Sequence, residues 1–202
     1  MIDHLLAGGP VMVPIALCSV IALAVFLERM WTLRRANIVP EALSVELAGL
    51  VRQGRFDDAL LLCRTRQVAI ARVIEAALET RGAGRERMRE RVEEVGRREA
   101  AEMERFIPVL GTVASISPLL GLLGTVGGMI LTFQVIQSEG LGNVGSLAGG
   151  ISQALVTTFA GLSVGIPALV ANRYALARVD AQLLEMEEVV GAIIEAIEEA
   201  QA

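Results

Sequence analysis

The chain contains no lysine, so its entire positive charge comes from 18 arginines. Histidine, tryptophan and tyrosine occur once each and cysteine twice in 202 residues. This scarcity leaves no group of residues with metal-ligand spacing and no nucleophile beside a base. The glycine-rich stretch that includes residues 121–128 does not follow a predicted strand, as a phosphate-binding loop would. We therefore expect no enzyme, no metal and no cofactor.

The two cysteines are not expected to form a disulfide. Cys18 lies in an apolar run near the N-terminus and Cys63 in a charged segment, so the two differ in depth and compartment. Each is expected to be a small buried apolar residue. The single histidine, His4, has no visible partner.

Charge is missing altogether from two long stretches, residues 106–137 and 140–172. About 20 predominantly apolar residues suffice for a helix to cross a bilayer. Hydrophobic residues make up 53% of the chain and its mean hydropathy is +0.56, which is typical of a membrane protein. Both stretches are therefore predicted to be transmembrane helices.

A third span is predicted from Val11 to Leu27, which Leu5, Leu6 and Ala7 would extend. The alternative is a cleavable signal peptide. That interpretation needs a basic start and a small-residue cleavage site, whereas this start carries Asp3. A membrane span is the favoured interpretation.

Arginine placement predicts the topology. Sixteen arginines lie between Arg29 and Arg105, two follow the last span, and none lies in residues 1–28 or 106–172. Arginine-rich flanks stay in the cytoplasm, and those after the first span face an N-terminus without lysine or arginine. We expect the N-terminus outside and the C-terminus in the cytoplasm.

The predicted fold is an all-α, three-span integral membrane protein with long helices that extend into the cytoplasm. Its expected segments are an N-terminal transmembrane helix (1–28), a cytoplasmic helical segment (29–84), a long helix that includes the second span (85–137), an external turn (138–143), the third span (144–173) and a cytoplasmic C-terminal helix (174–202). The long helix would measure about 75 Å at 1.5 Å per residue. Pro108 and Pro118 are expected to kink it without ending it.

Cytoplasmic helices are predicted at Glu41–Gln53, Phe56–Arg66 and Val68–Thr80, from proline and glycine boundaries and apolar periodicity. The C-terminal helix carries apolar residues at alternating three- and four-residue steps. They are Leu176, Val179, Leu183, Met186, Val190, Ile193 and Ile197. Such a seam does not identify its partner, so packing within the subunit and packing between subunits both stay open.

Small and hydroxyl-bearing residues recur inside the spans. Close helix packing is predicted at the glycine pairs Gly124 with Gly128, Gly145 with Gly149, and Gly161 with Gly165. A stripe at helical pitch in the second span contains Ala114, Pro118, Gly121, Thr125, Gly128 and Thr132.

Two threonines, Thr125 and Thr158, lie near the middle of their spans and hence at similar depth. Each hydroxyl either bonds its own helix backbone or lines a pore. None of the three membrane cores contains an ionisable residue. If the protein conducts protons, the titrating group must therefore come from another chain.

Two motifs resemble the ExbB/TolQ/MotA proton-channel family, most closely ExbB and TolQ. They are SPLLGLLGTVGGMI at 117–130, and GISQALVTTFAGL at 150–162 followed by Ile166 and Pro167. The resemblance implies a bacterial inner-membrane subunit that forms a ring, typically a homopentamer, around the helix of an ExbD- or TolR-like single-span partner. That partner supplies a transmembrane aspartate, and proton flow drives work on a TonB- or TolA-like protein.

The resemblance also assigns residues. It implies that Thr125 and Thr158 face the proton path, with Thr157 as the neighbouring candidate, and Thr132 continues the same stripe. Several ExbB-like proteins have glutamate where this chain has Gln153, and an amide does not titrate. Gln153 is therefore expected to form interhelical hydrogen bonds, alongside the packing glycines.

An alternative function is a membrane scaffold or assembly platform whose polar spans only pack, with no ion path. The cargo task, outer-membrane import or envelope maintenance, is not determined by these motifs.

Overall fold

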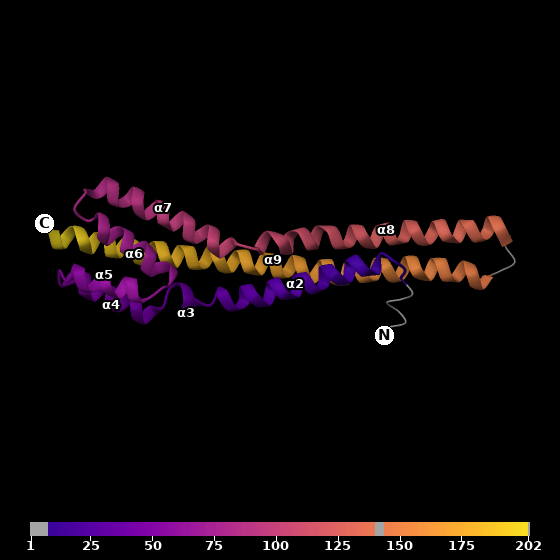
Figure 1. The fold of residues 1–202 in the computed structure, drawn as a ribbon, viewed down its shortest axis with the longest axis horizontal. Coiled ribbons are helices and arrows are strands. Elements are labelled where there is room, and N and C mark those ends of the chain that lie inside the picture. The colour runs from indigo at the N-terminus through magenta and orange to yellow at the C-terminus, as the bar shows by residue number, and fades with distance from the viewer. Residues whose placement is uncertain (1–7, 140–143, 202) are drawn as a thin grey trace. The chain divides into compact units, whose positions relative to one another are not determined.

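The computed structural model describes residues 8–139 and 144–201, and all regular elements in these ranges are helices (Figure 1). They are α2 (Met12–Thr32), α3 (Arg35–Ile38), α4 (Glu41–Arg52), α5 (Phe56–Thr65), α6 (Ala69–Thr80), α7 (Arg85–Glu104), α8 (Ile107–Glu139) and α9 (Val144–Gln201). Three stretches are long and apolar enough to cross a membrane: Met12–Thr32, which is α2, Arg85–Ser138, which includes α7 and most of α8, and Leu147–Ala200, which lies in α9. The prediction of an all-α protein with three spans is confirmed.

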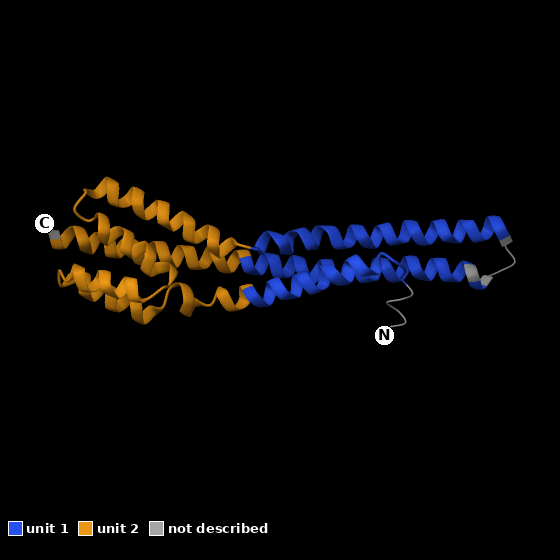
Figure 2. Cartoon of the chain, viewed as in Figure 1, with its two compact units in different colours: residues 1–28, 106–175 blue, residues 29–105, 176–202 orange. Residues whose placement is uncertain are grey.

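The chain divides into two compact units (Figure 2). Unit 1 comprises residues 1–28 and 106–175, which include α8 and the first part of α9. Unit 2 comprises residues 29–105 and 176–202, with α3 to α7 and the last part of α9. Unit 1 contains the uncharged stretches, and unit 2 contains nearly all the arginines.

The short helices of unit 2 follow their sequence signals. α4, α5 and α6 begin and end within about a residue of the predicted bounds. Gly54 follows α4 and Gly84 precedes α7 with positive φ values of 72° and 94°, a backbone conformation that glycine adopts without steric cost. The single-turn helix α3 was not predicted, because four residues are too few to show apolar periodicity.

The continuous helix expected over 85–137 is instead two helices, α7 and α8, separated at Arg105 and Phe106. Phe106 has φ 65°, which aromatic residues rarely adopt. The reason is Pro108, which has no N–H and whose ring would clash with the carbonyl of Glu104 in an unbroken helix. The break leaves Pro108 in the first turn of α8, where proline is tolerated. Pro118 lies inside α8, as predicted.

A buried arginine donates hydrogen bonds to carbonyls at the C-terminal end of α7. Arg29, which is 4% exposed, directs Nη1 toward the carbonyls of Glu102 at 3.3 Å and Met103 at 3.5 Å. The last carbonyls of a helix have no partner within it, so a cation placed there stabilises the helix end.

The apolar seam of the C-terminal helix packs inside its own subunit. Val179, Ile193 and Ile197 are at most 1% exposed within unit 2. For these three seam residues, the structure shows packing within the subunit. Val73 of α6, which is 2% exposed, lines one cavity with Met186, Val190 and Ile194 of this helix.

Two predictions fall wholly or partly outside the described residues. The proposed extension of the first span, Leu5 to Ala7, lies outside them, and so do residues 140–143 of the expected external turn. Ser138 and Glu139, assigned to that turn, are the last residues of α8.

Candidate functional site

The contact between α8 and α9 in unit 1 is built on glycines. A Cβ atom added at Gly161 would lie 2.5 Å from the carbonyl oxygen of Ser117 and 3.0 Å from the Cα of Gly121. One at Gly165 would lie 2.7 Å from Cγ of Pro118. Neither position has room for a side chain, so the two backbones approach closely, as small-residue spacing allows in membranes.

The contact continues along both helices. A Cβ atom at Gly128 would lie 2.6 Å from the carbonyl oxygen of Gly150, and one at Gly124 would overlap the side chain of Thr157. Gly124, Gly128, Gly161 and Gly165 thus lie where the predicted packing needs them. Gly149 is different, since a Cβ atom there would meet nothing within 4 Å, and Gly150 takes its place. Gly145, its predicted partner, is exposed.

Two of the four predicted pore-lining threonines lie inside this contact. Thr157 is fully buried, and its hydroxyl donates to the carbonyls of Ala154 at 2.9 Å and Gln153 at 3.1 Å. Thr132 is 5% exposed and donates to the carbonyl of Gly128 at 2.9 Å. Both hydroxyls therefore donate to carbonyls about one turn earlier in their own helix, and so are satisfied within the subunit.

The other two threonines are only half-buried. Thr125 donates to the carbonyl of Leu122 at 2.6 Å. Thr158 donates across the helix contact to the carbonyl of Gly121 at 3.4 Å. Gly121 is one helical turn from Thr125, so both threonines border the same face of the α8–α9 pair. A pore-lining role for any of the four stays a prediction.

Gln153 packs against the backbone that precedes α2. A Cβ atom at Gly9 would overlap its amide group, and Gly9 has φ 68°. A Cβ atom at neighbouring Gly8 would approach Thr157 Cγ2 at 3.2 Å. Gln153 and Thr157 thus connect α9 to the start of the first span. The amide is available for hydrogen bonding there but not for proton exchange.

Sequence reasoning missed two residues of the site. Gly150 was missed because the small-residue pattern in α9 has glycine at both 149 and 150, and only the crossing geometry selects between them. Ser117 was noted only as polar, yet its buried Oγ has no hydrogen-bond partner in the described part of the chain. Burying a hydroxyl without a hydrogen-bond partner costs free energy, so the residue type does not predict that Ser117 is buried. Only the fold shows it.

The arrangement can exchange hydrogen bonds but cannot itself titrate. Residues 107–138 and 144–172 contain hydroxyls and amides, but no Asp, Glu, Lys, Arg or His. Among the described residues, no group of His, Cys, Asp and Glu is placed to hold a metal ion. A proton path along these helices would need a carboxylate from elsewhere.

Comparison with known proteins identifies the family of the chain. Residues 65–188 match the model of the MotA/TolQ/ExbB proton channel family. The chain is 34% identical over 205 aligned positions to the biopolymer transport protein ExbB-like 1 of Synechocystis sp., covering 98% of this chain and 78% of that protein.

Two further relatives are similar over shorter stretches. The ExbB of Aquifex aeolicus is 37% identical over 90 residues, which are 45% of this chain and 61% of that protein. The Tol-Pal system protein TolQ of Haemophilus influenzae is 41% identical over 80 residues, which are 39% of this chain and 35% of that protein.

The matched region takes in the α8–α9 contact with its glycines and threonines. Together with the apolar helices, these similarities indicate an integral protein of the bacterial inner membrane. The chain belongs to the MotA/TolQ/ExbB proton channel family and is a membrane subunit of the ExbB/TolQ type.

Proposed function

We propose that this chain is the ring-forming subunit of a machine that converts proton motive force into mechanical work. Copies of the chain, expected to be five, surround the transmembrane helix of an ExbD- or TolR-like partner. That helix supplies the aspartate, and the motion passes to a TonB- or TolA-like protein in outer-membrane import or envelope maintenance. The N-terminus lies in the periplasm and the C-terminus in the cytoplasm.

The observation that carries the proposal is a pair of half-buried hydroxyls in spans that contain no ionisable side chain. Thr125 and Thr158 border one face of the α8–α9 pair on either side of Gly121. Hydroxyls with water can relay hydrogen bonds, but an ionisable group must hold the proton. The partner aspartate provides that group, and Thr125 and Thr158 connect it to either side of the membrane.

The proposal is tested by proton uptake in vesicles that contain this chain together with its single-span partner. Thr125→Val and Thr158→Val remove the hydroxyl and keep the shape. Each variant is expected to lower the proton flux about tenfold, because a tenfold change in rate corresponds to roughly the free energy of one hydrogen bond.

Thr112→Val is the matched control. This exposed threonine donates to the carbonyl of Pro108 at 3.0 Å, and at about 100° per residue it lies about 140° around α8 from Thr125. Its flux should equal wild type. Unchanged flux in both the Thr125 and Thr158 variants would exclude these residues from the path.

A non-conducting scaffold is the second candidate, because Thr132 and Thr157 are satisfied inside the subunit and act there in packing. Native mass measurement separates the two functions. The energiser requires a partner helix bound by several copies of this chain, whereas a scaffold forms its assembly without one.

A further inference from the structure

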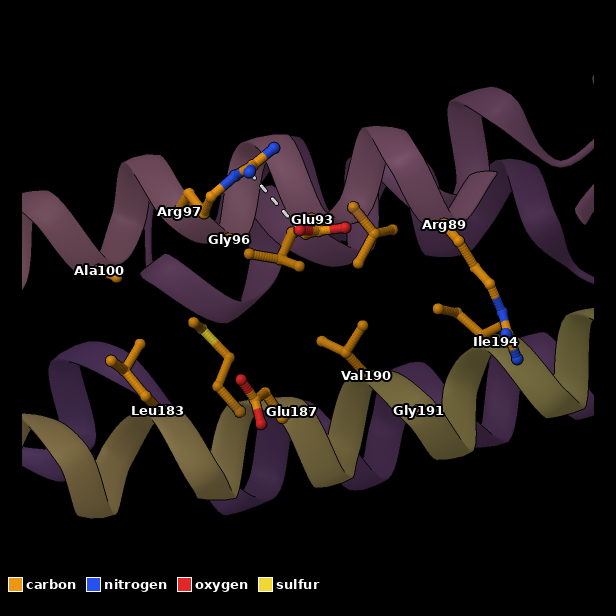
Figure 3. Close-up of a pocket in the computed structure, with 13 residues that line it drawn as sticks. Arg89, Glu93, Gly96, Arg97, Ala100, Leu183, Glu187, Val190, Gly191 and Ile194 are labelled. Carbon is orange, nitrogen blue, oxygen red and sulfur yellow. Dashed lines mark ion pairs between the residues drawn. The ribbon is translucent and has the colours of Figure 1, made fainter. Parts of the chain in front are cut away.

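Unit 2 contains an apolar groove between α7 and α9, with a cavity volume of about 340 Å³ (Figure 3). Val73 of α6, Val92 of α7 and Met186, Val190 and Ile194 of α9 are among its lining residues. Arg89 and Arg97 of α7 and Glu187 of α9 also line it. We call this feature the α7–α9 groove.

Two glycines in the groove face open space within the subunit. Gly96 of α7 and Gly191 of α9 both line it, and a Cβ atom at either would meet nothing within 4 Å. Glycine in the middle of a helix weakens it, and here no neighbouring helix or turn requires one. Glycines on a helix surface allow close approach of another chain, so the groove is open where a visiting helix would need room.

The face of α9 next to the groove carries an exposed apolar strip, consisting of Ala177, Ala181 and Leu184. Leu184 is 67% exposed, and both alanines are exposed as well. Steps of four and three residues place all three side chains on one face of the helix. Glu188 and Glu195 continue this face and are exposed. None of these residues lines the groove.

The charges of the two surfaces are complementary. Beyond residue 175, α9 has seven carboxylates and one arginine. In the part of the chain that the structure describes, Glu188 and Glu195 form no ion pair, and neither does Arg89 at the rim of the groove. Unpaired charges of opposite sign on two surfaces favour contact between copies.

The two surfaces also match in level along the helices. Figure 3 shows Ala100 and Arg97 near Leu183 at one end of the groove, and Arg89 near Ile194 at the other. When copies are related by a rotation axis parallel to these helices, equivalent residues of all copies lie at the same height along that axis. Leu184 of one copy is then level with Ala100 of the next, and Glu195 with Arg89.

We propose that the apolar strip of one copy docks in the α7–α9 groove of its neighbour, with Glu195 paired to Arg89 across the interface. The contact is heterologous, since the strip of one copy meets the groove of the next and the two consist of different residues, and such contacts generate a ring when the rotation between copies closes. This inference rests on the proposed ring and names the surface that closes it in unit 2.

Cysteine crosslinking between two co-expressed copies tests the docking. In a background with Cys18→Ala and Cys63→Ala, one copy carries Leu184→Cys and the other Ala100→Cys. We expect a crosslinked pair on mild oxidation. The matched control replaces Leu184→Cys with Leu61→Cys on α5, which is 64% exposed and lies outside the groove, and its yield should be at least about tenfold lower.

Native mass measurement on the same preparation distinguishes the failures. A ring of wild-type mass with no preference for Leu184 over Leu61 would overturn the docking and leave the proposed function standing. Monomers alone would overturn both.

Charge reversal gives an independent readout. Arg89→Glu should lower the Leu184–Ala100 crosslink yield about tenfold, and adding Glu195→Arg should restore it. Helical content by circular dichroism confirms that each variant is folded. Failure of the second substitution to restore crosslinking in a folded protein would overturn the ion pair.

Discussion

The two units hold their helices together by different means. In unit 1, α8 and α9 contact each other through backbone and glycine, and large side chains such as Phe133, Leu155 and Phe159 are more than 60% exposed. In unit 2, aliphatic side chains form a buried core, and arginines pair with carboxylates between helices. Arg72 bonds Glu99 at 2.6 Å, and this hydrogen bond raises the pKa of the arginine.

The difference follows from the solvent of each unit. Lipid is as apolar as leucine, so burial between spans gains little and close backbone packing must supply the attraction. Water rewards burial of apolar surface, so unit 2 assembles a conventional core with charged groups outside. A kind of substitution that destabilises one unit should therefore have little effect when it is made in the other unit.

The largest expected effect concerns the core of unit 2. Burial raises the pKa of the Cys63 thiol to about 12, and the side chain is 3% exposed. Because only the thiolate is alkylated, the native protein at pH 8 should react roughly a thousandfold more slowly than an ordinary thiol. The rate is measured with iodoacetamide on a Cys18→Ala variant and compared with the unfolded chain. Equal rates before and after unfolding would show that unit 2 has no protected core.

The next largest effect is expected when a single methyl group is added in the α8–α9 contact. Gly161→Ala places a Cβ atom 2.5 Å from the carbonyl oxygen of Ser117, so the helices must separate, at a cost of about 1–3 kcal/mol. Gly127→Ala is the control, since a Cβ atom there meets nothing within 4 Å and alanine favours the helix by up to about 1 kcal/mol. Thermal unfolding in detergent measures both. Equal melting temperatures for the two variants would contradict the close contact.

A smaller loss is expected from breaking an ion pair of unit 2. Arg72→Met leaves the carboxylate of Glu99, which is 8% exposed, without its arginine, and should cost about 1–2 kcal/mol after allowance for the half-exposed arginine. Arg97→Met provides the comparison, because the Arg97–Glu93 pair is about 70% exposed on both sides and should cost less than about 0.5 kcal/mol. Denaturant titration of the two variants checks the order, and the reverse order would contradict it.

The smallest effect is the pH dependence of an exposed pair on α7. A hydrogen bond from Arg91, aided by the charges of Arg91 and Arg98, lowers the pKa of Glu94. A carboxylate with a lowered pKa stabilises the fold above its unfolded pKa, and this contribution disappears as pH falls through the folded value. The melting temperature of Glu94→Gln should therefore be slightly below wild type at pH 7 and equal to it in acid. A difference that stays constant between these conditions would contradict the assignment.

Much of this architecture followed from local patterns. The uncharged runs predicted the spans because bilayer thickness sets their length, and prolines and glycines predicted α4 to α6 nearly to the residue. The break at Phe106 did not follow, because Pro108 permits either a kink or a new helix start. The two carbonyls that accept from Arg29 lie 73 and 74 residues away in sequence. The periodicity of the C-terminal seam did not identify its partner either, whereas the structure places Val73 of α6 beside Met186 and Val190.

By itself, the sequence determined that this chain is helical, that three stretches suit a bilayer and that those stretches carry no ionisable group, since composition and periodicity are properties of the chain alone. Only the tertiary structure decided which hydroxyls are buried. Thr157 and Thr158 are adjacent and chemically identical, yet one lies fully buried against Gly124 and the other remains half-buried beside Gly121. The crossing of α8 and α9 selects between them, because a helix turns by about 100° per residue and the second helix covers only one side.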